Sequence, residues 1–101
     1  MIRSCGETKM AKQLAIITVM GRDRTGIIAA FSQVLAKYDI NIEDLEQKVF
    51  EGTFVMMMVV DVTGASCDLG SLRKRLERVG KTLGMGVHLQ HESIFKAMHR
   101  I

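Results

Sequence analysis

The residues with the clearest potential for chemistry form a loop, Gly21–Gly26 (GRDRTG), between an apolar segment and an amphipathic one. Its two glycines permit a tight turn and a close approach of the backbone to a ligand. The free amides at the start of the following helix would face an anion at the positive end of the helix dipole, and a carboxylate group suits that position. The alternative, which the spacing leaves open, is that Asp23 only caps the helix and the glycines only turn the chain.

The other polar residues do not form a nucleotide or metal motif. The loop matches neither the phosphate-binding pattern GxxxxGK[ST] nor GxGxxG. His88 and His91 are three residues apart on an expected strand, so they would point to opposite faces and would not share a metal ion. We therefore predict that the protein holds no metal and no cofactor.

Groups for covalent or acid–base catalysis are not paired in the sequence. Ser32 and Ser71 have no evident histidine and acid partners, and Asp44 between Glu43 and Glu46 is typical of an exposed strand edge. The consecutive methionines Met56–Met58 would alternate between the two faces of a strand, which favours packing over metal binding. We predict that the protein is not an enzyme.

The composition is that of one folded domain. The chain has 101 residues, of which 48% are apolar and 25% charged, with no proline and a net charge of +3. Its basic residues are spread along the chain among acids, and those on one expected helix indicate a solvated face rather than a nucleic-acid patch. Cys5 and Cys67 form no CxxC pair, which fits a reducing compartment, and we expect a cytoplasmic protein.

The N-terminal residues 1–11 are expected to form a flexible arm. Residues 1–9 are polar and lack the apolar region of a signal peptide, and the natural start could be Met1 or Met10. The longest apolar run, Phe54–Val60, is too short to span a bilayer, so we expect no membrane partner.

The hydrophobic pattern around the loop predicts a strand, a helix and a second strand. Residues 13–20 (QLAIITVM) are apolar on both faces, as in a central strand. Apolar residues then recur at helical spacing from Ile27 to Tyr38, and the helix should end near Asp39. In the strand expected over 40–51 the apolar phase slips by one residue at Glu43-Asp44, which predicts a bulge.

The second half predicts a hairpin, a helix and an edge strand. A turn at Glu51-Gly52 leads into a strand over 53–62 that is apolar on both faces. An amphipathic helix follows over 68–83, with Asp68 as its N-cap and Gly84 just past its end. Residues 87–92 alternate like a half-exposed edge strand, and residues 93–101 are expected to form a short C-terminal helical tail.

This order predicts an α+β, ferredoxin-like βαββαβ fold, a two-layer sandwich with a four-stranded antiparallel sheet. The first and third strands should lie in the centre, since both are apolar on both faces. We expect residues 15, 17 and 19 to share a face with residues 55, 57 and 59, and residues 14, 16 and 20 to share the other with residues 54, 56, 58 and 60. Helices can cover only one face, so the other predicts a homo-oligomer, either a dimer or a higher one. Coverage by the tail or the arm is the alternative.

From about Lys12 to Ile101 the sequence resembles the ACT domain, a ligand-sensing βαββαβ module, which divides the chain into an arm (1–11) and a domain (12–101). The resemblance lies in the strand ending at Gly21, the loop and helix start 23–27, the helix end at Tyr38-Asp39 and the segment 40–42. Residues 91–101 are similar to the same region of small stand-alone ACT proteins. The chain is also similar to the regulatory protein of the glycine cleavage system.

The resemblance implies an amino acid bound at a subunit interface, between this loop and the start of the second strand, and a target enzyme or regulator that is controlled in trans. Many ACT loops have proline where this chain has Thr25, and some ACT domains bind no ligand and serve only to oligomerise. The residues carried over as ligand-binding are Gly21, Asp23, Arg24, Thr25, Gly26, Ile27, Asn41, Ile42 and Asp44.

Two further functions are disfavoured by the sequence. RNA-binding sheets of this topology stack bases on exposed aromatic residues, whereas the expected central strands offer only Phe54, so we expect no nucleic-acid partner. A small enzyme of the acylphosphatase type needs an arginine and an asparagine at a phosphate cradle, and the sequence shows no such motif.

Overall fold

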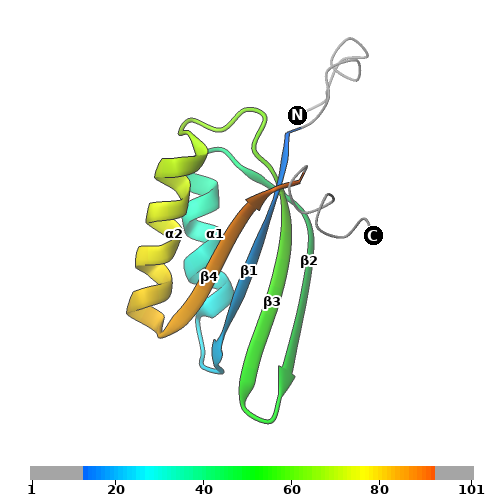
Figure 1. The fold of residues 1–101 in the computed structure, drawn as a ribbon, viewed down its shortest axis with the longest axis vertical. Coiled ribbons are helices and arrows are strands. Elements are labelled where there is room, and N and C mark those ends of the chain that lie inside the picture. The colour runs from blue at the N-terminus through cyan, green and yellow to red at the C-terminus, as the bar shows by residue number, and fades with distance from the viewer. Residues whose placement is uncertain (1–12, 93–101) are drawn as a thin grey trace.

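Four strands and two helices make up the computed structural model, which describes residues 13–92 (Figure 1). The expected arm (1–11) and helical tail (93–101) lie outside the described residues. None of the described helices is long and apolar enough to cross a membrane. In chain order the elements are β1 (Leu14–Arg22), α1 (Ile27–Lys37), β2 (Asn41–Phe50), β3 (Thr53–Asp61), α2 (Leu69–Leu83) and β4 (Met85–His91).

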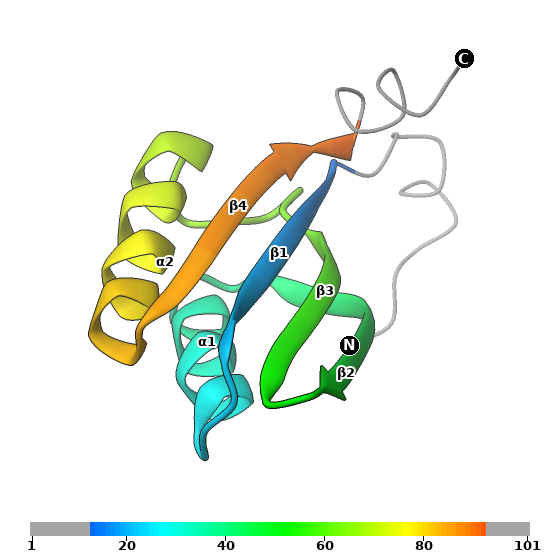
Figure 2. The ribbon, with the colours of Figure 1, turned by 60° about the horizontal axis from the view of Figure 1, so that its bottom comes forward.

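All strand pairs in the sheet are antiparallel, and the strand order is β2-β3-β1-β4 (Figure 2). The two strands that are apolar on both faces, β1 and β3, lie in the centre as predicted. Ile17 of β1 stands opposite Met58 of β3 and Leu89 of β4. The arrangement confirms the ferredoxin-like α+β fold.

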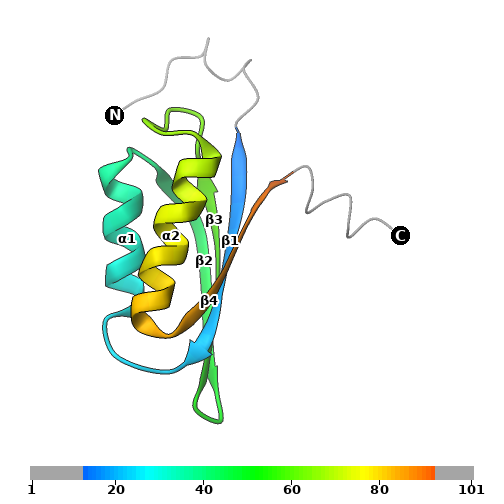
Figure 3. The same ribbon diagram turned by 60° about the vertical axis from the view of Figure 1, so that its left-hand side comes forward.

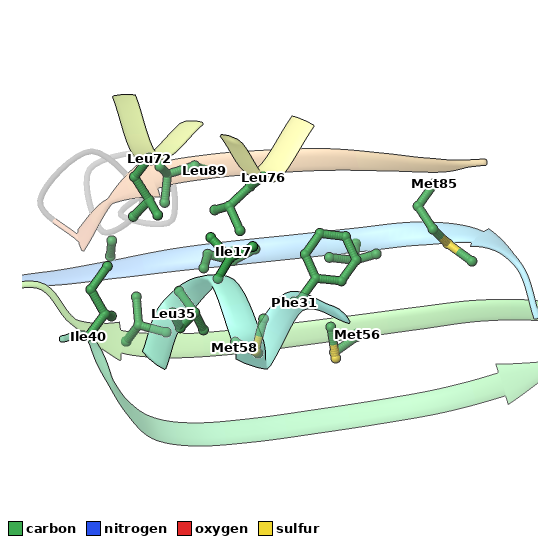
Figure 4. Close-up of a cluster of buried hydrophobic side chains, with 14 of the residues drawn as sticks. Ile17, Phe31, Leu35, Ile40, Met56, Met58, Leu72, Leu76, Met85 and Leu89 are labelled. Carbon is green, nitrogen blue, oxygen red and sulfur yellow. The ribbon is translucent and has the colours of Figure 1, made fainter. Parts of the chain in front are cut away.

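Both helices cover the same face of the sheet, so the molecule has two layers (Figure 3). Between the layers lies a core of apolar side chains from every element but β2, most of them less than 5% exposed (Figure 4). Phe31 and Leu35 of α1 and Leu72 and Leu76 of α2 pack onto the sheet residues around Ile17. This burial is the main source of the stability of the fold.

The expected grouping of side chains on the two faces is wrong. Because Ile17 pairs with Met58, the β1 residues 15, 17 and 19 share the helix-covered face with residues 54, 56, 58 and 60 of β3. Alternation within one strand cannot show which of its faces matches which face of a neighbour, since that depends on the register. The outer face therefore carries Leu14, Ile16, Met20, Val55, Met57 and Val59.

The expected turns and caps are present. Asp68 accepts a hydrogen bond from the Ser71 amide at 3.1 Å and caps α2, which ends at Gly84 with a φ of 75°. The β2–β3 turn has φ values of 51° at Glu51 and 81° at Gly52. The bulge lies in β2 between Ile42 and Asp44, where the sequence placed it.

The strand β4 begins two residues earlier than the sequence pattern predicts. The strand begins at Met85 rather than at Val87, because Met85 and Gly86 already pair with the end of β1. Met85 lies between two glycines, and its side chain is buried against the core. This burial and the pairing with β1 keep Met85 and Gly86 in the extended conformation of a strand.

Candidate functional site

Gly21 belongs to the end of β1 rather than to a ligand-binding loop. It pairs with Phe54 of β3 and Met85 of β4. A Cβ atom at this position would lie 2.6 Å from the Met85 sulfur and 2.8 Å from the Gly84 carbonyl oxygen. Gly21 is therefore required by packing at the sheet corner, and it does not line the pocket described below.

The loop itself is held to the neighbouring hairpin. The Asp23 amide donates a hydrogen bond to the Gly52 carbonyl at 2.9 Å. Gly26 then starts α1 with a left-handed φ of 84°, and its carbonyl accepts from the Ala30 amide at 3.0 Å. No side chain caps the N-terminus of α1, so the alternative that Asp23 is a cap is wrong.

A pocket of about 290 Å³ lies between this loop, the first turn of α1 and the hairpin β2–β3. Its floor is apolar, with Ile27 and Phe54 both buried, whereas Asp23, Arg24 and Gln47 are exposed at its rim. The rim thus offers a carboxylate, a guanidinium and an amide close to a helix N-terminus. The lining residues are Asp23, Arg24, Gly26, Ile27, Ile28, Ala29, Gln47, Val49 and Phe54.

The three candidate residues of β2 lie at the far end of the sheet. Asn41 stands opposite Asp61 at one end of the 10-residue strand, whereas Phe50, at the other end, stands opposite Thr53 next to the loop. Such a strand spans roughly 30 Å. Within one chain, Asn41, Ile42 and Asp44 are therefore not brought to the pocket.

Two of these polar side chains bind atoms of their own strand. The Asn41 amide group donates to a Glu43 carboxylate oxygen at 3.1 Å, and the Asp44 carboxylate accepts from the Leu45 amide at 2.8 Å. Thr25 is exposed and does not line the pocket. Of the nine candidates, Asp23, Arg24, Gly26 and Ile27 meet at the pocket.

Sequence reasoning missed Gln47, Val49 and Phe54, which complete the pocket. Val49 stands opposite Phe54 and Gln47 opposite Met56, so both β2 residues lie on the helix-covered face. The tight turn at Glu51-Gly52 was recognised in the sequence, and counting back from it would have placed these residues beside the start of α1. The signal was available in the hairpin register.

The described residues form no group of three histidine, cysteine or acidic side chains that could hold a metal ion. His88 and His91 lie on opposite faces of β4, as expected, since His88 stands opposite Thr18 and His91 opposite Ala15. Burial, together with the nearby Asp68 charge, raises the pKa of the Cys67 thiol. A raised pKa disfavours the reactive thiolate.

Comparison with known proteins links this geometry to a family. Residues 13–90 match the family model of the ACT domain. A UPF0237 protein of Methanocaldococcus jannaschii is 48% identical over 86 residues, which cover 85% of this chain and 96% of that relative.

Two solved structures are also similar. An ACT domain protein from Streptococcus pneumoniae superposes with a TM-score of 0.73 at 38% identity, over 84% of this chain and 96% of that one. A putative glycine cleavage system transcriptional repressor shares the fold with a TM-score of 0.69 at 21% identity, over 81% of this chain and 46% of that one.

Proposed function

This chain belongs to the ACT domain family, whose members are regulatory, ligand-binding domains, and we propose that it is an amino-acid sensor that works as a homodimer and regulates another protein in trans. The observation that carries the proposal is the pocket between the loop and the hairpin, where Asp23 and Arg24 flank the uncapped N-terminus of α1. We propose no catalytic step for it.

A free amino acid suits this pocket because a zwitterion needs an anion-binding surface and a cation-binding surface a few ångströms apart. In the proposal, the ligand carboxylate lies at the first-turn amides of α1, aided by the Arg24 guanidinium. The ligand ammonium group lies at the Asp23 carboxylate. The buried side chains of Ile27 and Phe54 give the ligand side chain an apolar floor.

The proposed dimer forms along β2, which is a free edge of the sheet in the described chain. Near the pocket this edge exposes Val49 (52%) and Phe50 (66%), and exposed apolar edges promote pairing with another strand. If two β2 strands pair antiparallel, the start of one lies beside the end of the other. This geometry would bring Asn41 and Asp44 of the partner subunit toward the pocket, where the single chain leaves them distant.

Action in trans is supported by the length of the archaeal relative. That protein is matched over 96% of its length, which leaves no room in it for a catalytic domain beside the matched part. The free thiol of Cys67 suits a reducing compartment, and we place the protein in the cytoplasm.

A second candidate function is an oligomerisation module that binds no ligand. It is favoured by the outer face of the sheet, where Met20 is 52% and Met57 40% exposed beside half-buried Val55 and Val59. Such an apolar face suits contact with another protein surface. In this case the pocket would have no ligand and the outer face would be the functional surface.

A thermal-shift screen of the twenty amino acids separates the two functions. A ligand present at 100 times its dissociation constant should stabilise the protein by about 2.7 kcal/mol. The N-acetylated and the C-amidated forms of the active amino acid serve as controls, since each lacks one of the two charges, and both should give smaller shifts. A screen in which no amino acid raises the melting temperature favours the oligomerisation module.

A further inference from the structure

The two helices of this domain carry a large excess of positive charge. Of the charged residues in the two helices, six are basic and Glu77 is the one acid. The basic residues are Lys37 of α1 and Arg73, Lys74, Arg75, Arg78 and Lys81 of α2. The edge strand β2 carries the opposite excess, since it contains Glu43, Asp44 and Glu46 against Lys48. Most of the positive charge of the described residues therefore lies in the helix layer.

Three of these cations converge on a groove between α1 and α2, which lie side by side (Figures 1 and 3). The groove has a volume of about 430 Å³, and Lys37, Arg75 and Arg78 line it together with Val34 and Val79. On each helix the first and last lining residues are seven positions apart in the sequence, which corresponds to about 10 Å. The groove therefore combines an apolar strip with cations along a short length.

Within residues 13–92, none of these three cations forms an ion pair. The Lys37 ammonium lies 5.9 Å from the centre of the Tyr38 ring, which leaves its charge unneutralised. Arg73 of α2 differs, because its guanidinium donates to the Leu89 carbonyl at 3.1 Å and helps to hold α2 to β4. The groove cations have no such structural partner, and their mutual repulsion would be relieved by an anionic ligand.

We infer that the groove between α1 and α2 is the docking site for an acidic segment of the protein that this domain regulates. This inference rests on the proposed function in one respect only, that the regulated target is a separate protein. Arginine guanidinium groups match carboxylates in a two-hydrogen-bond geometry, so Arg75 and Arg78 suit glutamate or aspartate side chains. Ala30 and Val79, both half-buried at the groove, provide the contact for one apolar side chain between those acids.

A peptide segment fits these observations better than a nucleic acid. The lined length of about 10 Å is short for a tract of phosphates, and base stacking needs exposed aromatic rings. The aromatic residue within the two helices, Phe31, is fully buried. The apolar residues beside the cations would not contribute to phosphate binding. They would contact the apolar side chain of an amphipathic peptide.

The test uses fluorescence anisotropy with the full chain and a labelled peptide in which one leucine is flanked on both sides by glutamates. The double variant Arg75→Glu with Arg78→Glu should weaken peptide binding by about tenfold or more, whereas Lys74→Glu with Lys81→Glu, which makes the same charge change outside the groove, should weaken it far less. A matched peptide with glutamines should bind poorly. Binding should also weaken as salt is raised.

Several results would overturn the inference. These are equal losses in the two double variants, tighter binding of a single-stranded oligonucleotide than of the acidic peptide, or no measurable peptide binding by the wild type. Circular dichroism, together with the milder pair Arg75→Gln and Arg78→Gln, checks that a loss does not come from unfolding. The amino-acid thermal shift should be unchanged in the groove variants, so a failure of the groove and a failure of the sensor are separate results.

Discussion

The Asp23 amide donates to the Gly52 carbonyl at 2.9 Å, which joins the loop before α1 to the turn between β2 and β3. This bond links two segments far apart in the sequence and holds the loop to the hairpin whose strands line the pocket. It also leaves the exposed Asp23 carboxylate at the pocket rim, since the helix that follows takes its N-cap from Gly26. The loop is therefore positioned by backbone contacts, and its side chains remain available for a ligand.

Gly26→Ala should destabilise the protein by about 1–2 kcal/mol, because a residue with a Cβ atom is strained at a φ of 84°. A Cβ atom there would meet nothing within 4 Å, so the cost is conformational rather than steric. Gly64→Ala is the matched control, with open space and no positive φ. Urea denaturation measures both, and equal stabilities would show that the αL start of α1 is not strained by alanine.

Gly21→Ala should cost about 1–3 kcal/mol for a different reason, the clash of its Cβ atom with Met85 and the Gly84 carbonyl. Gly86→Ala on the facing strand is the control, because its nearest contact, the Met20 carbonyl oxygen, is an ordinary one at 3.6 Å. Thermal melts of the two variants test the packing role. If Gly21→Ala has the melting temperature of the wild type, the claim that β1 and β4 pack too closely here for a Cβ atom is contradicted.

Asp68 should make the stability of the protein depend on pH in the acidic range. Hydrogen bonds from Ser71 lower the pKa of Asp68 from its ordinary value of 3.8. The stabilisation is then fully present above that value and is lost as the pH falls through the lower pKa of the folded protein. Asp68→Asn, which still caps the helix, should lose less stability between neutral and acidic pH than the wild type. Melting curves at several pH values test this, and identical pH dependence would contradict it.

Phe50→Glu should weaken the proposed dimer, since it places a charge on the exposed end of the β2 edge. Met57→Glu on the outer face of β3 also places a charge at an exposed apolar residue, but away from the β2 edge, and should leave the dimer intact. Sedimentation at tens of micromolar protein distinguishes them. If instead Met57→Glu gives the monomer and Phe50→Glu does not, the outer face is the interface and the oligomerisation module becomes the better function.

The fold could be predicted from the sequence because its signals are local. The bulge at Glu43-Asp44, the turn at Glu51-Gly52 and the caps of α2 each follow from a few adjacent residues, and the apolar phases of β1 and β3 placed them in the centre of the sheet. Where two strands had to be aligned, the prediction was wrong. Ile17 was placed with Met57, whereas the register pairs it with Met58.

In the candidate site, too, the residues that are close in sequence were predicted, and those that depend on the pairing of strands were not. Asp23, Arg24, Gly26 and Ile27 are consecutive or nearly so, and the structure brings them to one pocket. Gln47 was missed because its position at the pocket depends on the register of the hairpin β2–β3. Asn41 was included through resemblance, and a single chain leaves it at the other end of β2; its role depends on a second subunit, which the sequence of one chain does not specify.

The most direct test of the sensor is calorimetric titration of the amino acid found in the thermal-shift screen into the wild type, Asp23→Ala, Gln47→Ala and Gln33→Ala. Asp23 and Gln47 lie at the pocket rim, whereas Gln33 is an exposed glutamine of α1 outside it. Each rim variant should lose about tenfold in affinity or more, since a hydrogen bond to a charged group contributes about 1.5–3 kcal/mol, and Gln33→Ala should bind like the wild type. Unchanged affinity in both rim variants, or no binding of any amino acid below millimolar concentration, would contradict the proposed site.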